Sequence, residues 1–197
     1  MKHIGIFLDR DGTVNEEVDF LSSPDKLSLI PRSADAIRQA NELGIKVFIV
    51  TNQSGIARGL LTEQQLAIIH QTLTERLQHE NAFIDAIYYC PHHPEIGKPP
   101  YRMHCDCRKP NIGMLTRAAT EFSVDLNESF VVGDRMIDIQ TARAAGSTGI
   151  LVLTGYGKNE LRLCETNHLA IDYVAENLFD AVRYIKQKVR AKKTSVS

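Results

Sequence analysis

The feature that most constrains this chain is a short apolar run at residues 4–8, followed directly by two aspartates, a glycine and a threonine. The run is rich in β-branched and aromatic residues and is too short for a helix, so it predicts a buried strand. Gly12 lets the backbone turn sharply after that strand. Asp9 and Asp11 would then lie at its carboxyl end, where open α/β sheets place their active sites. For this stretch alone, an Asp-Gly turn that closes a hairpin is the alternative.

Length and composition indicate an ordinary globular protein. The chain has 197 residues, of which 43% are hydrophobic and 24% charged, and we expect a single domain over residues 1–197. The formal net charge of -1 gives no sign of a nucleic-acid or membrane partner. Apolar runs are too short for a signal peptide or a membrane span, so we expect a cytoplasmic protein. Its four cysteines would then be thiols or metal ligands rather than disulfides.

Strand and helix patterns alternate along the chain. Predicted strands cover residues 4–8, 45–50, 82–89, 129–132, 149–153 and 170–174. Predicted helices cover residues 34–43, 62–78, 110–122, 137–145 and 176–189. Ser33 is expected to cap the first helix, and Thr62 with Gln65 to form a capping box at the second. This alternation predicts a three-layer α/β/α sandwich around a parallel sheet.

Polar residues lie just after three of these strands: Asp9, Asp11, Thr51, Asn52 and Asp134. A further one, Lys109, lies just before a predicted helix. In a parallel sheet the strand tips share one edge, so these groups can converge. A phosphoryl group there would meet a hydroxyl at Thr51, a backbone N–H at Asn52 and an ammonium at Lys109. Crowded carboxylates would repel one another without a cation, and Mg²⁺ suits oxygen ligands.

These residues resemble the pattern of the haloacid dehalogenase (HAD)-like phosphatases: Asp-x-Asp-Gly-Thr, a strand-end Thr or Ser, a Lys, and Gly-Asp-x-x-x-Asp. The resemblance covers nearly the whole chain and implies a Rossmann-like parallel sheet. It implies that Asp9 attacks phosphorus to form an aspartyl-phosphate, and that Asp11 is the general acid and base. Thr51 and Lys109 would hold the phosphoryl oxygens.

The same resemblance implies a magnesium site. Mg²⁺ would be bound by the Asp9 carboxylate, the Asp11 backbone carbonyl and Asp134, with Asp138 as a supporting group. The spacing between the motifs leaves no room for a separate cap domain. Substrate selection would therefore fall to short loops.

One loop, residues 90–107, contains paired cysteine and histidine residues. Three thiolates and one imidazole match a tetrahedral zinc site: Cys90, His92, Cys105 and Cys107. Four protein ligands leave no open position, so such a zinc would be structural. His93 and His104 are possible substitute ligands, and reduced cysteines in a floppy loop are the alternative to a metal site.

Within the family, the segments around Thr51, Cys90 and Lys109 are most similar to a zinc-loop branch that includes heptose bisphosphate and histidinol phosphate phosphatases. The similarity implies removal of the C7 phosphate of D-glycero-D-manno-heptose 1,7-bisphosphate, a step toward activated heptose for lipopolysaccharide. Arg108 and Arg135 are available for the second phosphate, although the heptose enzymes often carry lysine at the latter position. Asn52 is also expected to bind substrate, and we expect a monomer that acts on this small phosphorylated sugar.

Two alternatives stay open. Histidinol phosphate carries an ammonium group, which the acidic Glu16, Glu17 and Asp19 after the first motif would suit. A zinc-stabilised binding module without catalysis is the other, although every catalytic position of the family motif is filled.

Overall fold

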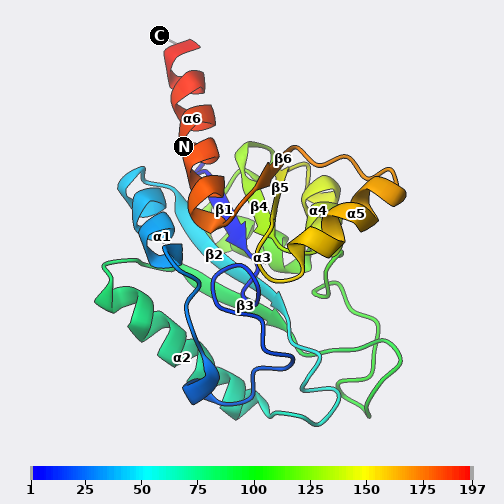
Figure 1. The fold of residues 1–197 in the computed structure, drawn as a ribbon. Helices are drawn as coiled ribbons and strands as arrows, with labels where there is room; N and C mark the ends of the chain where they lie inside the picture. Colours follow the sequence, from blue (N-terminus) through cyan, green and yellow to red (C-terminus); the bar gives the residue numbers. More distant parts are fainter. Residues whose placement is uncertain (1, 196–197) are drawn as a thin grey trace.

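The computed structural model describes residues 2–195. The strands of this region form one six-stranded sheet (Figure 1). The strands are β1 (Gly5–Leu8), β2 (Lys46–Asn52), β3 (Ala86–Cys90), β4 (Phe130–Gly133), β5 (Thr148–Val152) and β6 (Tyr173–Ala175). Their order is β3-β2-β1-β4-β5-β6, and every neighbouring pair is parallel. The chain reverses its direction of travel across the sheet between β1 and β4, which is where α/β sheets place their sites.

Helices cover both faces of this sheet. They are α1 (Ser33–Glu42), α2 (Glu63–His79), α3 (Gly113–Phe122), α4 (Met136–Ala145), α5 (Gly157–Thr166) and α6 (Leu178–Ser195), with short 3-10 turns η1 (Pro24–Lys26) and η2 (Leu126–Glu128). The predicted three-layer α/β/α arrangement is confirmed.

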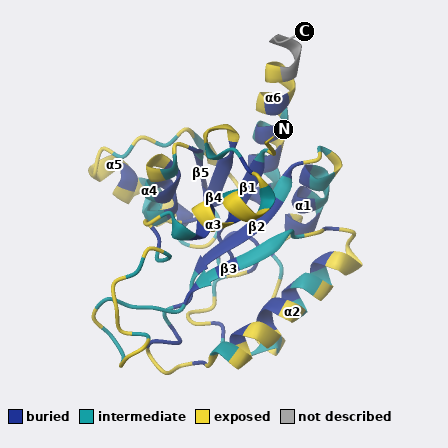
Figure 2. Ribbon diagram, turned by 180° about the vertical axis from the view of Figure 1, so that it is seen from behind, coloured by how far each residue is buried: buried dark blue, intermediate teal, exposed yellow. Residues whose placement is uncertain are grey.

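The alternation of side chains along β1 separates the two halves of the core. Ile6 and Leu8 belong to the cluster that contains the buried residues of α1, α2 and α6. Phe7 belongs to the cluster on the other face, with α3 and α4, where its ring stacks on Phe48 at 5.1 Å between centroids. Figure 2 shows the central strands buried and the outer helix surfaces exposed. The central strands are therefore held rigidly, and their tips with them.

Several predicted boundaries differ from the structure. Ser33 is the first residue of α1 rather than its cap; Arg32 precedes it with φ 68°, and the buried Ser33 hydroxyl has no hydrogen-bond partner. The predicted strand 82–89 begins only at Ala86, because the Asp85 carboxylate accepts the Val47 N–H that a longer ladder would use. Among residues 2–195, no helix is long and apolar enough to cross a bilayer.

Helix α5 was not predicted at all. Only Gly157 and Cys164 of this helix are buried, and most of its other residues are charged or polar, so its sequence has few of the apolar residues that mark a packed helix. Its place beside α4 and β5 brings Glu160 and Leu163 to the site described next.

Candidate active site

The tips of β2, β1 and β4, which are adjacent strands, bring the predicted residues to one edge of the sheet. A cleft of about 390 Å³ opens there, and its lining includes Asp9, Asp11, Thr51, Asn52, Arg108, Lys109 and Arg135. Thr51 ends β2 with Asn52, while Asp9 and Asp134 each follow their strand by one residue. The convergence expected from the strand pattern is therefore observed.

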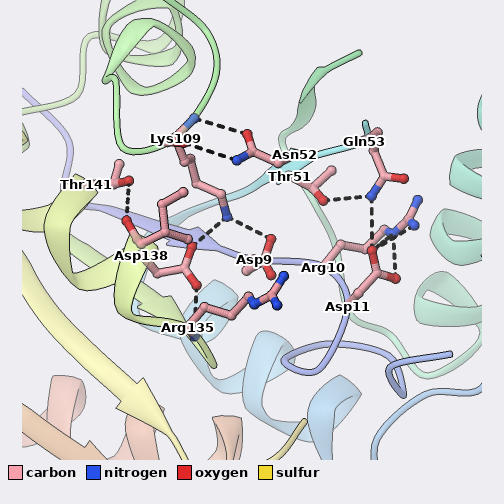
Figure 3. A network of polar contacts seen from close by, with 11 residues as sticks. Asp9, Arg10, Asp11, Thr51, Asn52, Gln53, Lys109, Arg135, Asp138 and Thr141 are labelled. Carbon is pink, nitrogen blue, oxygen red and sulfur yellow. Dashed lines mark hydrogen bonds and ion pairs between the residues drawn. The ribbon is translucent and has the colours of Figure 1, made fainter. Parts of the chain in front are cut away.

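Lys109 lies at the centre of the polar network in Figure 3 and is 2% exposed. Its Nζ donates to Asp9 Oδ1 at 2.8 Å and to Asp138 Oδ1 at 2.6 Å. Burial alone would lower the pKa of Lys109, but the charges of Asp138 and Asp9 raise it above its usual range. The ammonium therefore stays charged at the point where a phosphoryl group would bind.

Asn52 fixes the backbone of Lys109 from the neighbouring strand. Its amide oxygen accepts the Lys109 N–H at 3.0 Å, and its amide nitrogen donates to the Lys109 carbonyl at 3.2 Å. Asn52 lines the cleft as well, and its predicted contact with substrate stays a prediction.

Three buried carboxylates stand next to this lysine. Oxygen atoms of Asp9, Asp134 and Asp138 lie within 4.8 Å of one another. Burial raises the pKa of Asp9 to about 6, and burial together with the Asp9 charge raises the pKa of Asp134 to about 8. Asp134 Oδ2 accepts the Tyr156 N–H at 2.8 Å, whereas the buried Oδ1 has no hydrogen-bond partner. An orphaned carboxylate oxygen among repelling carboxylates fits a hard cation such as Mg²⁺.

Close backbone approach shapes this carboxylate site. A Cβ on Gly12, whose φ is +75°, would lie 2.1 Å from Asp134 Oδ2, and so would a Cβ on Gly155. Both glycines are required because a side chain at either position would occupy the space of the Asp134 carboxylate.

The Asp11 carboxylate is held apart from that cluster. It accepts from the guanidinium of Arg10 at 2.9 Å, from Asn15 at 2.9 Å and from Gln53 at 3.0 Å. Burial would raise the pKa of Asp11, but the Arg10 charge and these hydrogen bonds lower it overall. Gln53 also donates to Thr51 Oγ1 at 2.9 Å, and so links Asp11 to the strand-end hydroxyl.

Arg10 was missed by sequence reasoning. It is wholly buried, and its Nη1 lies 3.1 Å from His70 Nε2 on α2. Because a guanidinium cannot accept, His70 Nε2 accepts here and its proton resides on Nδ1. Burial and the Arg10 charge lower the pKa of His70 to about 3, so the imidazole is neutral. A charged residue at a strand end normally reads as exposed, and its position between two aspartates was the available signal.

The cysteine loop gathers the four predicted ligands into one cluster: Cys90, His92, Cys105 and Cys107. Cys105 Sγ lies 3.5 Å from Cys90 Sγ and 3.3 Å from Cys107 Sγ, and His92 Nδ1 lies 3.4 Å from Cys107 Sγ. Ligands about 2.3 Å from a tetrahedral zinc would be separated by about 3.7 Å, so the cluster is compatible with zinc. His93 Nδ1 instead accepts two backbone N–H groups, from Glu95 and Ile96.

The loop delivers Arg108 to the cleft. Arg108 Nη1 donates to the His92 carbonyl at 3.1 Å, so a residue of the cysteine cluster supports the arginine directly. Burial raises the pKa of Cys107 to about 11, and a bound dication would favour the thiolate instead.

Arg135 also lines the cleft, with its guanidinium carbon 4.6 Å from the centroid of the Tyr156 ring. Its Nε lies 3.9 Å from Glu160 of α5. A third arginine near the site, Arg58, has its guanidinium carbon 5.6 Å from the centroid of the Phe20 ring and is not among the residues lining the cleft. Of the acidic residues after the first motif, Glu17 lines the cleft.

Comparison with known proteins agrees with this fold and site. A family model described as HAD-hydrolase-like matches residues 106–181, which include Lys109, Asp134 and Asp138. The fold and site are those of this class of hydrolase.

Two similar proteins identify the family within this class of hydrolase. The D-glycero-D-manno-heptose-1,7-bisphosphate 7-phosphatase of Chlorobaculum tepidum is 40% identical over 183 residues, covering 90% of this chain and 91% of the relative. The D-glycero-beta-D-manno-heptose-1,7-bisphosphate 7-phosphatase of Escherichia coli K12 is 39% identical over 183 residues, covering 93% and 94%. The chain belongs to this family of HAD-like phosphatases.

A solved structure also matches over nearly the full length. The D,D-heptose 1,7-bisphosphate phosphatase of B. bronchiseptica, complexed with magnesium and phosphate, superposes with a TM-score of 0.83 at 37% identity. The match covers 95% of this chain and 99% of that chain.

Proposed function

We propose that the protein is a Mg²⁺-dependent phosphomonoesterase that removes the C7 phosphate of D-glycero-D-manno-heptose 1,7-bisphosphate and leaves heptose 1-phosphate. The observation that carries the proposal is the cleft itself, in which Asp9 and Lys109 are 2.8 Å apart and two arginines line the walls. The names of the relatives support this substrate over histidinol phosphate. The reaction belongs to nucleotide-heptose and lipopolysaccharide synthesis, and we propose a cytoplasmic monomer.

Asp9 is the nucleophile in this proposal. Its carboxylate attacks phosphorus, a bond from Asp9 oxygen to phosphorus forms, and the bond from phosphorus to the C7 oxygen breaks. Asp11 protonates the departing sugar oxygen. Lys109, fixed by Asn52, and the Thr51 hydroxyl stabilise the charge on the phosphoryl oxygens.

The second half of the reaction releases phosphate. Asp11, now a carboxylate, takes a proton from water, which attacks phosphorus and displaces Asp9. Arg10 suits this step because it lowers the pKa of Asp11 and so favours the carboxylate form.

Two metals fit the residues present. The Asp9 and Asp134 carboxylates and the Asp11 carbonyl would hold Mg²⁺, with Asp138 fixing Lys109 beside them. When bound, Mg²⁺ supplies positive charge that offsets carboxylate repulsion and polarises the phosphoryl group. The Cys90, His92, Cys105 and Cys107 set would hold a structural zinc.

The second phosphate explains the arginines. With the reacting phosphate at Lys109, a bisphosphate needs further cations in the same cleft, and Arg108 and Arg135 line it. Histidinol phosphate would place an ammonium near these two cations, with Glu17 as the acidic counterpart.

Phosphate release with Mg²⁺ from heptose 1,7-bisphosphate and from histidinol phosphate tests the substrate. We expect a large advantage in kcat/KM for the bisphosphate, with about tenfold or more of it lost in Arg108→Ala. A preference for histidinol phosphate would overturn the substrate assignment. Absence of turnover of both by the folded, metal-loaded protein would favour the binding-module alternative.

A further inference from the structure

Tyr156 connects three parts of the molecule that are distant in sequence. Its backbone N–H donates to Asp134 Oδ2 at 2.8 Å, and its hydroxyl donates to Asp19 Oδ1 at 2.8 Å. Its ring lies 4.6 Å from the guanidinium carbon of Arg135. Tyr156 precedes α5, the helix that sequence reasoning missed, and is not itself among the residues lining the cleft.

The ring of Tyr156 restrains the guanidinium of Arg135. The Arg135 side chain is half-exposed, and an arginine held in one position loses considerable rotamer freedom. A guanidinium on an aromatic face is attracted by the negative face of the ring, which orders it before a ligand arrives. Glu160 assists from α5: its Oε1 lies 3.9 Å from Arg135 Nε, while its Oε2 accepts the Met136 N–H at 2.8 Å.

The hydroxyl of Tyr156 reaches the loop after the first motif. Asp19 and Phe20 have φ values of 34° and 61°, which place both in the left-handed region that non-glycine residues seldom adopt. The same loop carries Glu17 into the cleft. The hydroxyl contact therefore fixes a strained loop against the wall that holds Arg135.

We infer that Tyr156 is a positioning residue for substrate selection: its side chain sets Arg135 and the loop around Asp19 for the second phosphate of the substrate. The inference rests on the proposed function, in which Arg135 contacts that phosphate. The contact to Asp134 comes from the backbone, so side-chain variants keep it. The side chain therefore acts on recognition of the second phosphate, and the chemistry at Asp9 is left unchanged.

Steady-state kinetics on two matched substrates test this role: heptose 1,7-bisphosphate, and heptose 7-phosphate, which lacks the second phosphate. We expect Tyr156→Leu to raise KM for the bisphosphate about fivefold. This factor corresponds to the free energy of one cation–π contact at a half-exposed site. The kcat, and both constants for the 7-phosphate, should stay within about twofold. Tyr156→Phe keeps the ring and should lie between wild type and Tyr156→Leu.

Two further variants define the controls. Tyr173→Leu removes a tyrosine ring that stacks on Tyr184 elsewhere in the fold, and should leave both substrates unaffected. Tyr156→Met, an apolar replacement without a π face, repeats the test if the leucine variant does not fold. In the double variant Arg135→Ala with Tyr156→Leu, the loss of bisphosphate binding should be smaller than the two single losses combined, because part of the Tyr156 effect acts through Arg135.

The outcomes separate the inference from the function on which it rests. Equal losses on both substrates in Tyr156→Leu, or additive losses in the double variant, would overturn the positioning role. A selective loss in Arg135→Ala without any in Tyr156→Leu would overturn this inference alone. If Arg135→Ala treats both substrates alike, the assignment of Arg135 to the second phosphate is wrong, and the inference fails with it.

Discussion

Asn52 holds Lys109 through both ends of its side-chain amide, with contacts of 3.0 and 3.2 Å to the lysine backbone. Asn41 makes the same pair of contacts to Phe83, at 2.9 and 3.0 Å, at the opposite end of β2. The chain thus contains a matched control for the loss of such a clamp.

Asn52→Ala should lower kcat by about tenfold or more, because a misplaced lysine loses transition-state contacts that depend on geometry. Both Asn52→Ala and Asn41→Ala should lower the free energy of unfolding by about 1–2 kcal/mol, but Asn41→Ala should leave kcat unchanged. Steady-state kinetics and urea unfolding on both variants check this. Equal losses of kcat would show that the clamp acts only through stability.

The covalent step predicts a modified Asp9. Borohydride added during turnover should reduce the aspartyl-phosphate to the corresponding alcohol, and peptide mass spectrometry should locate it at residue 9. Asp9→Asn should abolish both turnover and labelling. Labelling at Asp134 or Asp138, or turnover by the Asn variant, would refute the assignment of Asp9.

Removal of Mg²⁺ should make stability depend on pH through Asp134. Because burial and Asp9 raise its folded-state pKa to about 8, well above the ordinary aspartate value of 3.8, its contribution is present at low pH and lost as pH rises through about 8. The Mg²⁺-free protein should therefore unfold in less urea at pH 8.5 than at pH 6.5. Asp134→Asn should flatten this change, and Mg²⁺ should reverse it in the wild type alone. An equal slope in the variant would contradict the prediction.

Stability should depend on pH in the opposite direction at lower pH, because of His70. Its pKa is lowered from 6.5 to about 3 by burial and the Arg10 charge, so stability is present above pH 6.5 and lost as pH falls toward 3. Between pH 6.5 and 4.5 the free energy of unfolding of His70→Gln should change less than that of the wild type. The difference should be up to about 1.4 kcal/mol per pH unit. His79→Gln, an exposed position on the same helix, is the control and should follow the wild type.

Zinc should support activity by ordering the backbone that carries Arg108 and Lys109, and should take no part in the reaction itself. Metal analysis should find about one zinc per chain, lost in Cys105→Ser together with about tenfold or more of kcat/KM. Cys164→Ala removes a thiol outside the cluster and should retain zinc and activity. Full activity of zinc-free protein in excess Mg²⁺ would show that the loop orders itself without metal.

The strand tips were predictable because parallel topology alone brings Asp9, Thr51 and Asp134 to one edge. The cysteine cluster was predictable because ligand chemistry limits which residue types can pair. Arg10 was not, since its burial depends on Asp11 and on His70, which arrives from α2. Contacts that depend on where a separate element packs leave no periodic trace in the sequence.

Helix α5 and Tyr156 were missed for the same reason. The helix contains and buries few apolar residues, and the position of its capping residue depends on contacts to Asp19 and Arg135. The part of the site to which we assign substrate selection is therefore the part that local sequence describes least.

Phosphorus NMR of heptose 1,7-bisphosphate during turnover shows directly which of the two phosphates the protein removes. The proposal predicts Mg²⁺-dependent loss of the C7 monoester signal and growth of inorganic phosphate, with the C1 signal retained. Loss of the C1 phosphate first, or no reaction by the folded, metal-loaded protein, would contradict it.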